Sequence, residues 1–200
     1  RLFQFRESRL MSNAHMRKKD PDKVRRSLLD RTARLAVDQG PQAITIQAVA
    51  EAAGVTKGGL LHHFSSKQAL IEAVFADLLQ HLGDEIDRYM AEDREPVGRF
   101  TRAYVRAAFA DHKLGMRSPW AALSVTTIFD PTMRKLWSDW LDARLEAHRE
   151  TDGSAQMEIV RLAADGVWMA DLMGQDREPL RDLSALEPQL LALASPSGAR

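Results

Sequence analysis

The sequence contains no cysteine, which excludes disulfide bonds and thiolate-ligated metal sites among its 200 residues. It also lacks any apolar run near the roughly 18 residues of a membrane-spanning helix, so we expect no membrane partner. No stretch has the basic, apolar and small-residue pattern of a secretory signal. These absences fit a reducing compartment, and we therefore expect a cytoplasmic protein.

Residues that break helices are scarce, with 11 glycines and 8 prolines in the whole chain. β-Branched residues are outnumbered by Ala, Leu, Arg, Asp and Glu, which favours an all-α fold. The first helix is predicted at 21–39, with Val24, Leu28, Leu35 and Ala36 facing inward. Later helices are expected at 96–112, 119–129, 131–150, from the break at 152–154 to about 172, and at 183–194.

The chain has no net charge, because 28 Lys and Arg residues balance 28 Asp and Glu residues. The charges are nevertheless unevenly distributed along it. Residues 16–67 hold ten basic and five acidic residues, or +5, whereas residues 68–200 hold fifteen and twenty-two, or −7. This asymmetry is expected of a DNA-binding module joined to a regulatory body. Chance clustering of solvated charges is the alternative.

Residues 45–64 have the pattern of two short helices around a tight turn. Gly54 lies where a helix ends and a positive φ is favoured, and Thr56 is a good N-cap for the next helix. In that second helix only Leu60 and Phe64 share an inward stripe, so the other side chains point outward. A short helix that presents small, polar and basic groups, supported by a preceding helix, suits insertion into the major groove of DNA.

A longer helix is predicted to follow, capped by Ser65 or Ser66. Ser65 and Gln68 have the spacing of a capping box. Apolar residues then recur at mixed steps of three and four from Leu70 to Ile86. A helix of this length, with one end against the N-terminal helices, could transmit motion between two parts of the protein.

Residues 24–70 contain a series of short motifs around the two helices and the turn. They are Ile44-Thr45, Val49-Ala50, Ala53-Gly54-Val55, Gly59-Leu60-Leu61-His62-His63-Phe64 and Ser66-Lys67-Gln68-Ala69-Leu70. A helix-turn-helix pattern alone is a weak signal, but the run that follows it is far more specific. With these residues, the segment 24–70 resembles the TetR family of bacterial transcriptional regulators.

The resemblance implies an all-α chain with an N-terminal three-helix DNA-binding domain that contains the helix-turn-helix. We expect this domain at 16–67, joined by the long helix to a larger helical domain at 68–200 for effector binding and dimerisation. Residues 1–15 are expected to be a tag or a disordered extension, since Ser12-Asn13-Ala14-His15-Met16 resembles a cloning scar before a start methionine.

The resemblance also implies that the helix from Thr56 to Phe64 is the recognition helix for a pseudo-palindromic operator in double-stranded DNA. Lys57 is the main candidate to read a base, because lysine can donate to guanine O6 and N7, although a phosphate contact is the alternative. Leu61 stands where relatives more often have tyrosine, which favours an apolar contact to a sugar or a thymine methyl. The candidate DNA-binding residues are Thr45, Gln47, Thr56, Lys57, Gly58, Gly59, Leu61, His62, His63 and Lys67.

Several of these residues have a simpler structural explanation. Thr45 is explained equally well as a helix cap, and Gly58 and Gly59 as a weak stretch of helix.

His63 and Lys67, in contrast, match positions in the family that contact phosphate groups.

TetR-like proteins are homodimers, and the resemblance implies that the last two long helices form a four-helix interface with a second copy. The residues fit this expectation. Residues 157–173 are apolar on more than one face, which predicts burial both in a core and against a partner. A dimer would place its recognition helices about 34 Å apart, or a multiple of that, on the DNA.

Three of the four tryptophans fall between residues 120 and 140, near other aromatic and methionine residues. A cavity lined in this way would suit a small hydrophobic effector, and Asp165 or Asp171 could favour a cationic one. Core packing is the alternative for each of these side chains. The candidate ligand-binding residues are Phe109, Met116, Trp120, Phe129, Met133, Trp137, Trp140, Trp168 and Met169.

An enzyme is not predicted. Asp77, His81 and Glu85 form one stripe with metal-compatible chemistry, but a solvated charged face explains them better. HExxH, P-loop and nucleophile-elbow motifs are missing, so we expect no catalytic residue, metal or cofactor. We expect a repressor released from its operator by the effector, through movement of the long helix. The alternative is an architectural DNA-binding protein or a regulator without effector, which predicts a filled core within residues 75–180.

Overall fold

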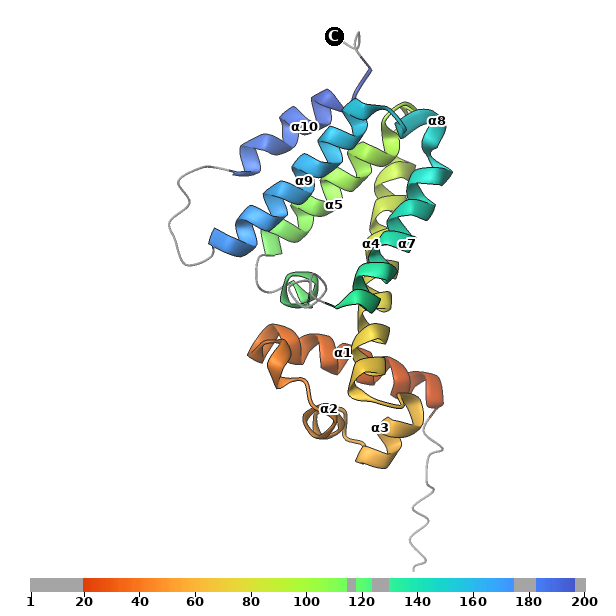
Figure 1. Ribbon diagram of the computed structural model, residues 1–200, viewed down its shortest axis with the longest axis vertical. Helices are drawn as coiled ribbons and strands as arrows, with labels where there is room; N and C mark the ends of the chain where they lie inside the picture. Colours follow the sequence, from red (N-terminus) through yellow and green to blue (C-terminus); the bar gives the residue numbers. More distant parts are fainter. Residues whose placement is uncertain (1–19, 115–117, 124–129, 175–182, 197–200) are drawn as a thin grey trace, which may run out of the picture.

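The computed structural model describes residues 20–114, 118–123, 130–174 and 183–196, with side chains except at 112–114, 171–174, 183 and 184. Within these ranges the regular structure is helical and contains no strand, which confirms the all-α fold. Figure 1 shows a group of N-terminal helices at one end of an elongated molecule and a helical bundle at the other. One long helix, α4 (Lys67–Glu92), runs from the group into the bundle.

The N-terminal group follows the expected boundaries closely. It consists of α1 (Pro21–Gln39), the 3-10 turn η1 (Pro41–Ala43), α2 (Ile46–Ala53) and α3 (Lys57–His63). The Asp20 side chain caps α1 by accepting a hydrogen bond from the Asp22 N–H, and α1 ends at Gly40, where φ is 83°. Of the residues predicted to face inward, Val24 and Leu35 are only half-buried. Thr32 is fully buried, and its hydroxyl donates to the Leu28 carbonyl oxygen at 2.7 Å, which satisfies the polar group inside the core.

The long helix α4 (Lys67–Glu92) has 26 residues, or about 39 Å at 1.5 Å per residue. Ser66 caps it by accepting a hydrogen bond from the Ala69 N–H at 3.0 Å. The capping box predicted for Ser65 and Gln68 is wrong, because the N-cap is Ser66. The Gln68 side chain donates to Glu72 and Asp130. The buried residues of α4 are Leu70, Val74, Phe75, Leu79, Gly83 and Ile86.

The bundle comprises α5 (Arg99–Leu114), α7 (Pro131–Ala147), α8 (Arg149–Asp152), α9 (Ala155–Gly174), η3 (Leu183–Leu186) and α10 (Glu187–Leu193). Residues 119–123 are also helical, while 124–129 lie outside the described residues. The single helix predicted at 131–150 is wrong, because the chain leaves helical geometry at His148 before α8 begins. The helix predicted at 183–194 opens as a 3-10 turn, with Pro188 in the first turn of α10.

Two main hydrophobic clusters hold the molecule together. One lies in the bundle, between α5, α9, α10 and the C-terminal half of α4, and includes Phe100 and Phe109. The other holds the N-terminal helices against the start of α4 and includes Leu28 and Leu60. Ala122 and Leu123 belong to this second cluster, so the segment 119–123 packs against the N-terminal helices. No helix in the described part of the chain is long and apolar enough to span a membrane.

Candidate nucleic-acid interface and effector cavity

The turn between α2 and α3 has the geometry that the sequence predicts. Gly54 adopts the left-handed conformation, with φ 65° and ψ 36°. Thr45 and Thr56 cap the two helices, each by accepting a hydrogen bond at 3.0 Å from the N–H three residues later. The caps do not exclude contacts with DNA, because both threonines remain exposed. The turn therefore fixes α3 against α2 as a helix-turn-helix unit.

The outer face of α3 presents the predicted set of side chains. Leu60 and Phe64 are buried, as the spacing indicated, and Arg25 lies over the Phe64 ring at 5.1 Å. Leu61 is an exposed apolar residue, with 45% of its surface accessible. The other outward positions of α3 are Lys57, Gly58 and His62, which are exposed, and Gly59 and His63, which are half-exposed.

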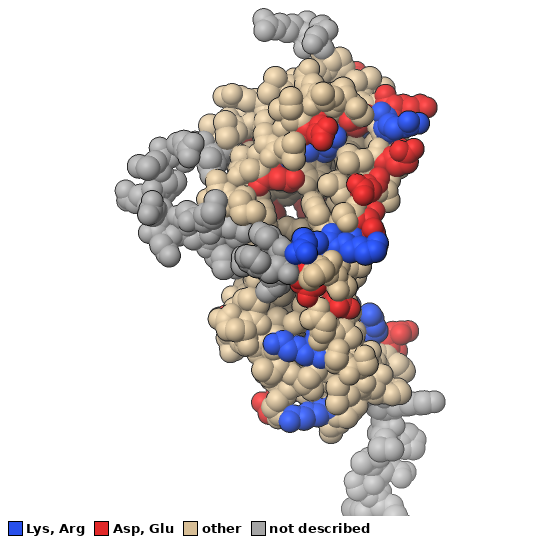
Figure 2. All heavy atoms as spheres, in the orientation of Figure 1, with Lys and Arg blue, Asp and Glu red and all other residues tan. Residues whose placement is uncertain are grey.

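Two further candidates flank this helix. Gln47 is exposed on α2, and one amide N–H of its side chain donates a hydrogen bond to Glu51, which leaves its other N–H and its oxygen for a contact with DNA. Lys67 is exposed at the first turn of α4. On the face drawn in Figure 2, Lys and Arg side chains lie over the lower, N-terminal helices, and most side chains along the upper right edge are acidic, although both signs occur in each part.

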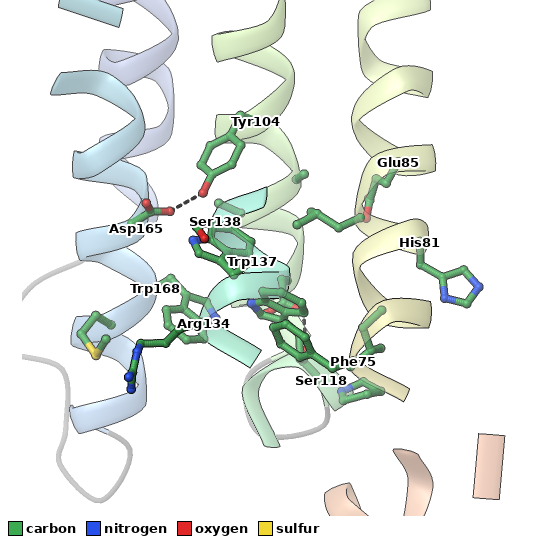
Figure 3. A pocket seen from close by; sticks show the side chains of 18 of the residues that line it. Phe75, His81, Glu85, Tyr104, Ser118, Arg134, Trp137, Ser138, Asp165 and Trp168 are labelled. Atoms are coloured by element: carbon green, nitrogen blue, oxygen red, sulfur yellow. Dashed lines mark hydrogen bonds between the residues drawn. The ribbon is translucent and has the colours of Figure 1, made fainter. Parts of the chain in front are cut away.

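A cavity of about 710 Å³ lies within the bundle, between α4, α5, α7, α9 and the segment 119–123. Trp120, Trp137, Trp168 and Met169 line it, as the sequence suggested. Figure 3 shows how side chains from these separate helices converge on it. Met116 and Phe129 lie outside the described residues.

Three candidates for this cavity lie elsewhere. Phe109 is fully buried in the core of the bundle, and Met133 packs beneath Phe75 and Leu79. Trp140 stacks on Trp137, with ring centroids 5.4 Å apart, and is not among the residues that line the cavity.

Other lining residues were missed from the sequence. They are Phe75, Leu78, His81, Leu82 and Glu85 on α4, Tyr104, Ala107, Ala108 and Asp111 on α5, Ser118 and Pro119 just before Trp120, and Arg134, Lys135 and Ser138 on α7. Asp165 on α9, named from the sequence as a group that could favour a cationic ligand, also lines the cavity. The apolar stripe of α4 was visible as a signal, but which of its residues meet a cavity depends on the neighbouring helices. Ala107 and Ala108 leave space on α5 where larger side chains would fill it.

Asp165 and Tyr104 form a polar contact in the wall of the cavity (Figure 3). The Tyr104 hydroxyl donates to Asp165 Oδ1 at 2.6 Å. Burial raises the pKa of the Asp165 carboxyl, against the opposing effects of the Tyr104 hydrogen bond and the Arg161 charge. Burial, followed by the charge of Asp165, raises the pKa of Tyr104 well above its ordinary value.

The cavity and the N-terminal helices share structural elements. Phe75 of α4 stacks on Trp120, with ring centroids 5.3 Å apart. The neighbouring residue on α4, Val74, and Leu123 of the segment 119–123 lie in the N-terminal hydrophobic cluster. Phe75 and Trp120 therefore lie next to residues that pack against the N-terminal helices, and a change in their packing would be passed to those helices through Val74 and Leu123.

The acidic and histidine stripe of α4 has local partners. Asp77 accepts a hydrogen bond from Arg26 of α1 at 2.6 Å and lies 3.5 Å from His81. A search of the described ranges finds no group of three or more His, Cys, Asp or Glu side chains placed to hold a metal ion.

Family models match two segments of the chain. Residues 28–74 match the bacterial regulatory proteins of the tetR family, and residues 98–195 match the tetracyclin repressor-like C-terminal domain. The two segments together cover most of the sequence and coincide with the helix-turn-helix and the bundle. The chain belongs to the TetR family of transcriptional regulators, whose members bind DNA through a helix-turn-helix.

Individual relatives agree with this assignment. The HTH-type transcriptional regulator BetI of Serratia proteamaculans (strain 568) is 25% identical over 183 residues, covering 86% of this chain and 88% of the relative. The HTH-type transcriptional repressor KstR2 of Mycolicibacterium smegmatis is 31% identical over 85 residues, which is 42% of each chain. A transcriptional regulator of Saccharomonospora viridis, solved in complex with choline, has the same fold, with TM-score 0.66 at 17% identity over 84% of this chain and 94% of that one.

Proposed function

We propose that this protein is a homodimeric transcriptional repressor that leaves its operator when a small, largely apolar molecule occupies the bundle cavity. In this proposal residues 16–67 bind DNA, and residues 68–200 bind the effector and the second copy. The exposed face of α3 carries the proposal, since it presents Lys57, Leu61 and both histidines on a helix that α2 supports. The description of KstR2 as a repressor supports the proposed direction of regulation.

The described surface of α9 and α10 supports a dimer. Val160 and Ala164 of α9 are buried in the bundle. On its other face Ile159 and Leu162 expose 65% and 61% of their surface, and Leu193 of α10 exposes 52%. Large apolar side chains grouped on two adjacent helices are typical of an interface between subunits.

The cavity favours a regulator with an effector over an architectural DNA-binding protein. An architectural protein needs no internal space, whereas a volume of about 710 Å³ lies within the usual range of ligand sites. The choline complex of the Saccharomonospora viridis regulator adds that a protein of this fold takes a small molecule.

We propose that two elements carry the effector signal to the DNA-binding helices. The first is α4, which places Phe75 at the cavity and Val74 in the N-terminal cluster. The second is the segment 119–123, which places Trp120 at the cavity and Leu123 in the same cluster. An effector that prefers one arrangement of these side chains changes the separation of the two α3 helices and thereby lowers operator affinity.

The test is fluorescence anisotropy of labelled DNA from the region flanking the gene, titrated with the whole protein across a salt series. We expect tight binding that weakens steeply with salt, because Lys and Arg contacts to phosphate release counterions. Lys57→Ala should weaken binding by about 1–3 kcal/mol if the side chain reads a base.

Arg94→Ala is the matched control, since it also removes one exposed positive charge but lies beyond the far end of α4. It should leave DNA affinity nearly unchanged. An affinity for DNA that does not change with salt concentration would contradict the proposed function. The same conclusion would follow if the protein bound no sequence, either in the flanking DNA or in a genomic library, more tightly than the rest.

A further inference from the structure

The wall of the cavity formed by α9 carries two polar groups in an otherwise largely apolar and aromatic setting (Figure 3). Asp165 and Trp168 are three residues apart on the helix and both line the cavity. At that spacing two side chains lie on one face, with their Cβ atoms about 5–6 Å apart. A single small molecule can therefore contact both groups.

The carboxylate of Asp165 has one recorded hydrogen bond among the described residues, the one that Oδ1 accepts from Tyr104. The buried cation on the same helix, Arg161, donates instead to Thr101 Oγ1 and to the Asp152 carbonyl oxygen. No salt bridge to Asp165 occurs within the described ranges. Among the described residues, the cavity wall thus holds a partly buried carboxylate without a contact cation.

Trp168 supplies the complementary feature. Its indole Nε1 is buried, and no hydrogen-bond acceptor contacts it in the part of the chain that the structure describes. A buried donor left in this state is destabilising, and such groups are few in folded proteins. Because the Nε1 atom has almost no accessible surface, an acceptor on a molecule in the cavity would satisfy it once the indole ring turns its N–H toward that molecule.

The rest of the lining favours a positive charge. The rings of Phe75, Trp120 and Trp137 line the cavity, and Trp120 lies within 5.5 Å of each of the others between ring centroids. The faces of aromatic rings attract cations. The basic lining residues Arg134 and Lys135 are exposed, and Lys135 already pairs with Asp139 at 2.7 Å.

We propose that the effector is a small organic cation that carries a hydrogen-bond acceptor a few bonds from its charged nitrogen. The ammonium group lies against the Asp165 carboxylate and the aromatic rings, and the acceptor takes the Trp168 Nε1 hydrogen bond. An uncharged ligand leaves Asp165 without a counter-charge, and an anionic ligand is repelled by it. This inference rests on the proposed effector function and names the chemical class of that effector.

The test uses three matched probes, with binding to the whole protein followed by calorimetry and tryptophan fluorescence. Phenacyltrimethylammonium has an aromatic ring, a carbonyl acceptor and a fixed positive charge. In 3,3-dimethyl-1-phenylbutan-1-one a neutral carbon replaces the nitrogen at nearly the same shape. Phenethyltrimethylammonium keeps the charge but has no carbonyl. We expect the first probe to bind most tightly, by about tenfold or more over the neutral ketone.

Two substitutions assign the contacts. Asp165→Asn keeps the side-chain shape and should lower the affinity of both cations by about tenfold while leaving the ketone unaffected. Trp168→Phe removes the N–H and should lower the affinity of the two carbonyl probes by about fivefold, with a smaller loss for phenethyltrimethylammonium. Glu85→Gln, another lining carboxyl group, is the matched control and should have the smaller effect on the cations.

The outcomes separate this inference from the proposed function. Equal affinity for the cation and the ketone, no loss with Asp165→Asn, or no binding of any probe would overturn the cation site. Release of DNA by an uncharged compound would in that case still sustain the proposed function. Conversely, cations that bind as expected but leave DNA affinity unchanged would sustain the site and overturn the effector role.

Discussion

Gly54 illustrates how much one backbone conformation contributes to the DNA-binding unit. Its φ of 65° and ψ of 36° end α2 and direct the chain into α3. A Cβ atom at this position would meet nothing within 4 Å, so the requirement is conformational and does not arise from crowding. The left-handed region costs an L-residue about 1–2 kcal/mol.

We therefore expect Gly54→Ala to lower the free energy of unfolding by about 1–2 kcal/mol, measured by urea denaturation followed by circular dichroism. Gly54→Asn is the matched variant, and its loss should be smaller because asparagine tolerates positive φ better than alanine. Equal losses for the two variants would show that something other than backbone conformation limits this position.

At the scale of helices, Arg102 of α5 ties three separate segments together. Its side chain is 6% exposed and donates to Asp93 Oδ2 at 2.7 Å. It also donates to the carbonyl oxygens of Glu95 and Val97 in the loop before α5, and of Ala194 after α10, each at 2.7 Å. The end of α4, the start of α5 and the end of α10 are thereby held in one place.

Arg102→Met should lower the free energy of unfolding by about 3 kcal/mol or more at pH 7, because it leaves Asp93 and three carbonyl groups without their donor. The free energy of unfolding of both proteins is measured by urea denaturation. Retention of full stability would mean that water or other side chains replace these bonds.

The same pair makes stability depend on pH. Burial by itself raises the pKa of Asp93, but the hydrogen bonds from Arg102 and the Glu95 N–H, with the Arg102 charge, outweigh it and lower the pKa. The ionised carboxyl group therefore stabilises the fold above the ordinary Asp pKa of about 4, and this contribution is lost as pH falls through the lowered folded pKa. The loss in free energy of unfolding caused by Asp93→Asn should be full at pH 7 and should shrink as the pH falls through that acidic range. The substitution Asp84→Asn, at an exposed residue, should cause little loss at pH 7 or in that range.

For the whole molecule, the proposed dimer is the property on which operator binding would depend most. Two copies of α3 must be held at a fixed separation, and the exposed apolar face of α9 is the proposed means. The double variant Ile159→Glu and Leu162→Glu should be monomeric by size-exclusion chromatography with light scattering, because the interface would have to bury two charges from each subunit.

The matched control is Leu61→Glu, the same kind of change at an exposed leucine on α3. It should leave the oligomeric state unchanged while weakening DNA binding. A double variant that still elutes as a dimer would place the subunit interface on another surface. A wild-type chain that is monomeric at micromolar concentration would contradict the proposed dimer itself.

Local rules predicted the N-terminal unit residue by residue. The caps at Thr45 and Thr56, the turn at Gly54 and the inward pair of Leu60 and Phe64 all depend on neighbours within one or two helical turns. The break at His148 escaped prediction because no proline or glycine marks it. The side of α4 that faces the cavity also escaped, since α5 and α7 decide which of its apolar residues remain uncovered.

The amino-acid sequence by itself determined the helical content, the helix-turn-helix and the family, because propensity, capping and a specific motif are properties of contiguous residues. Tertiary structure alone decided which aromatic residues surround empty space. It separated Trp120 and Trp137 at the cavity from Phe109 in the core, and it brought Tyr104 onto Asp165 across 61 positions. A cavity is the volume that several helices leave unfilled, and no single segment of the chain specifies that volume.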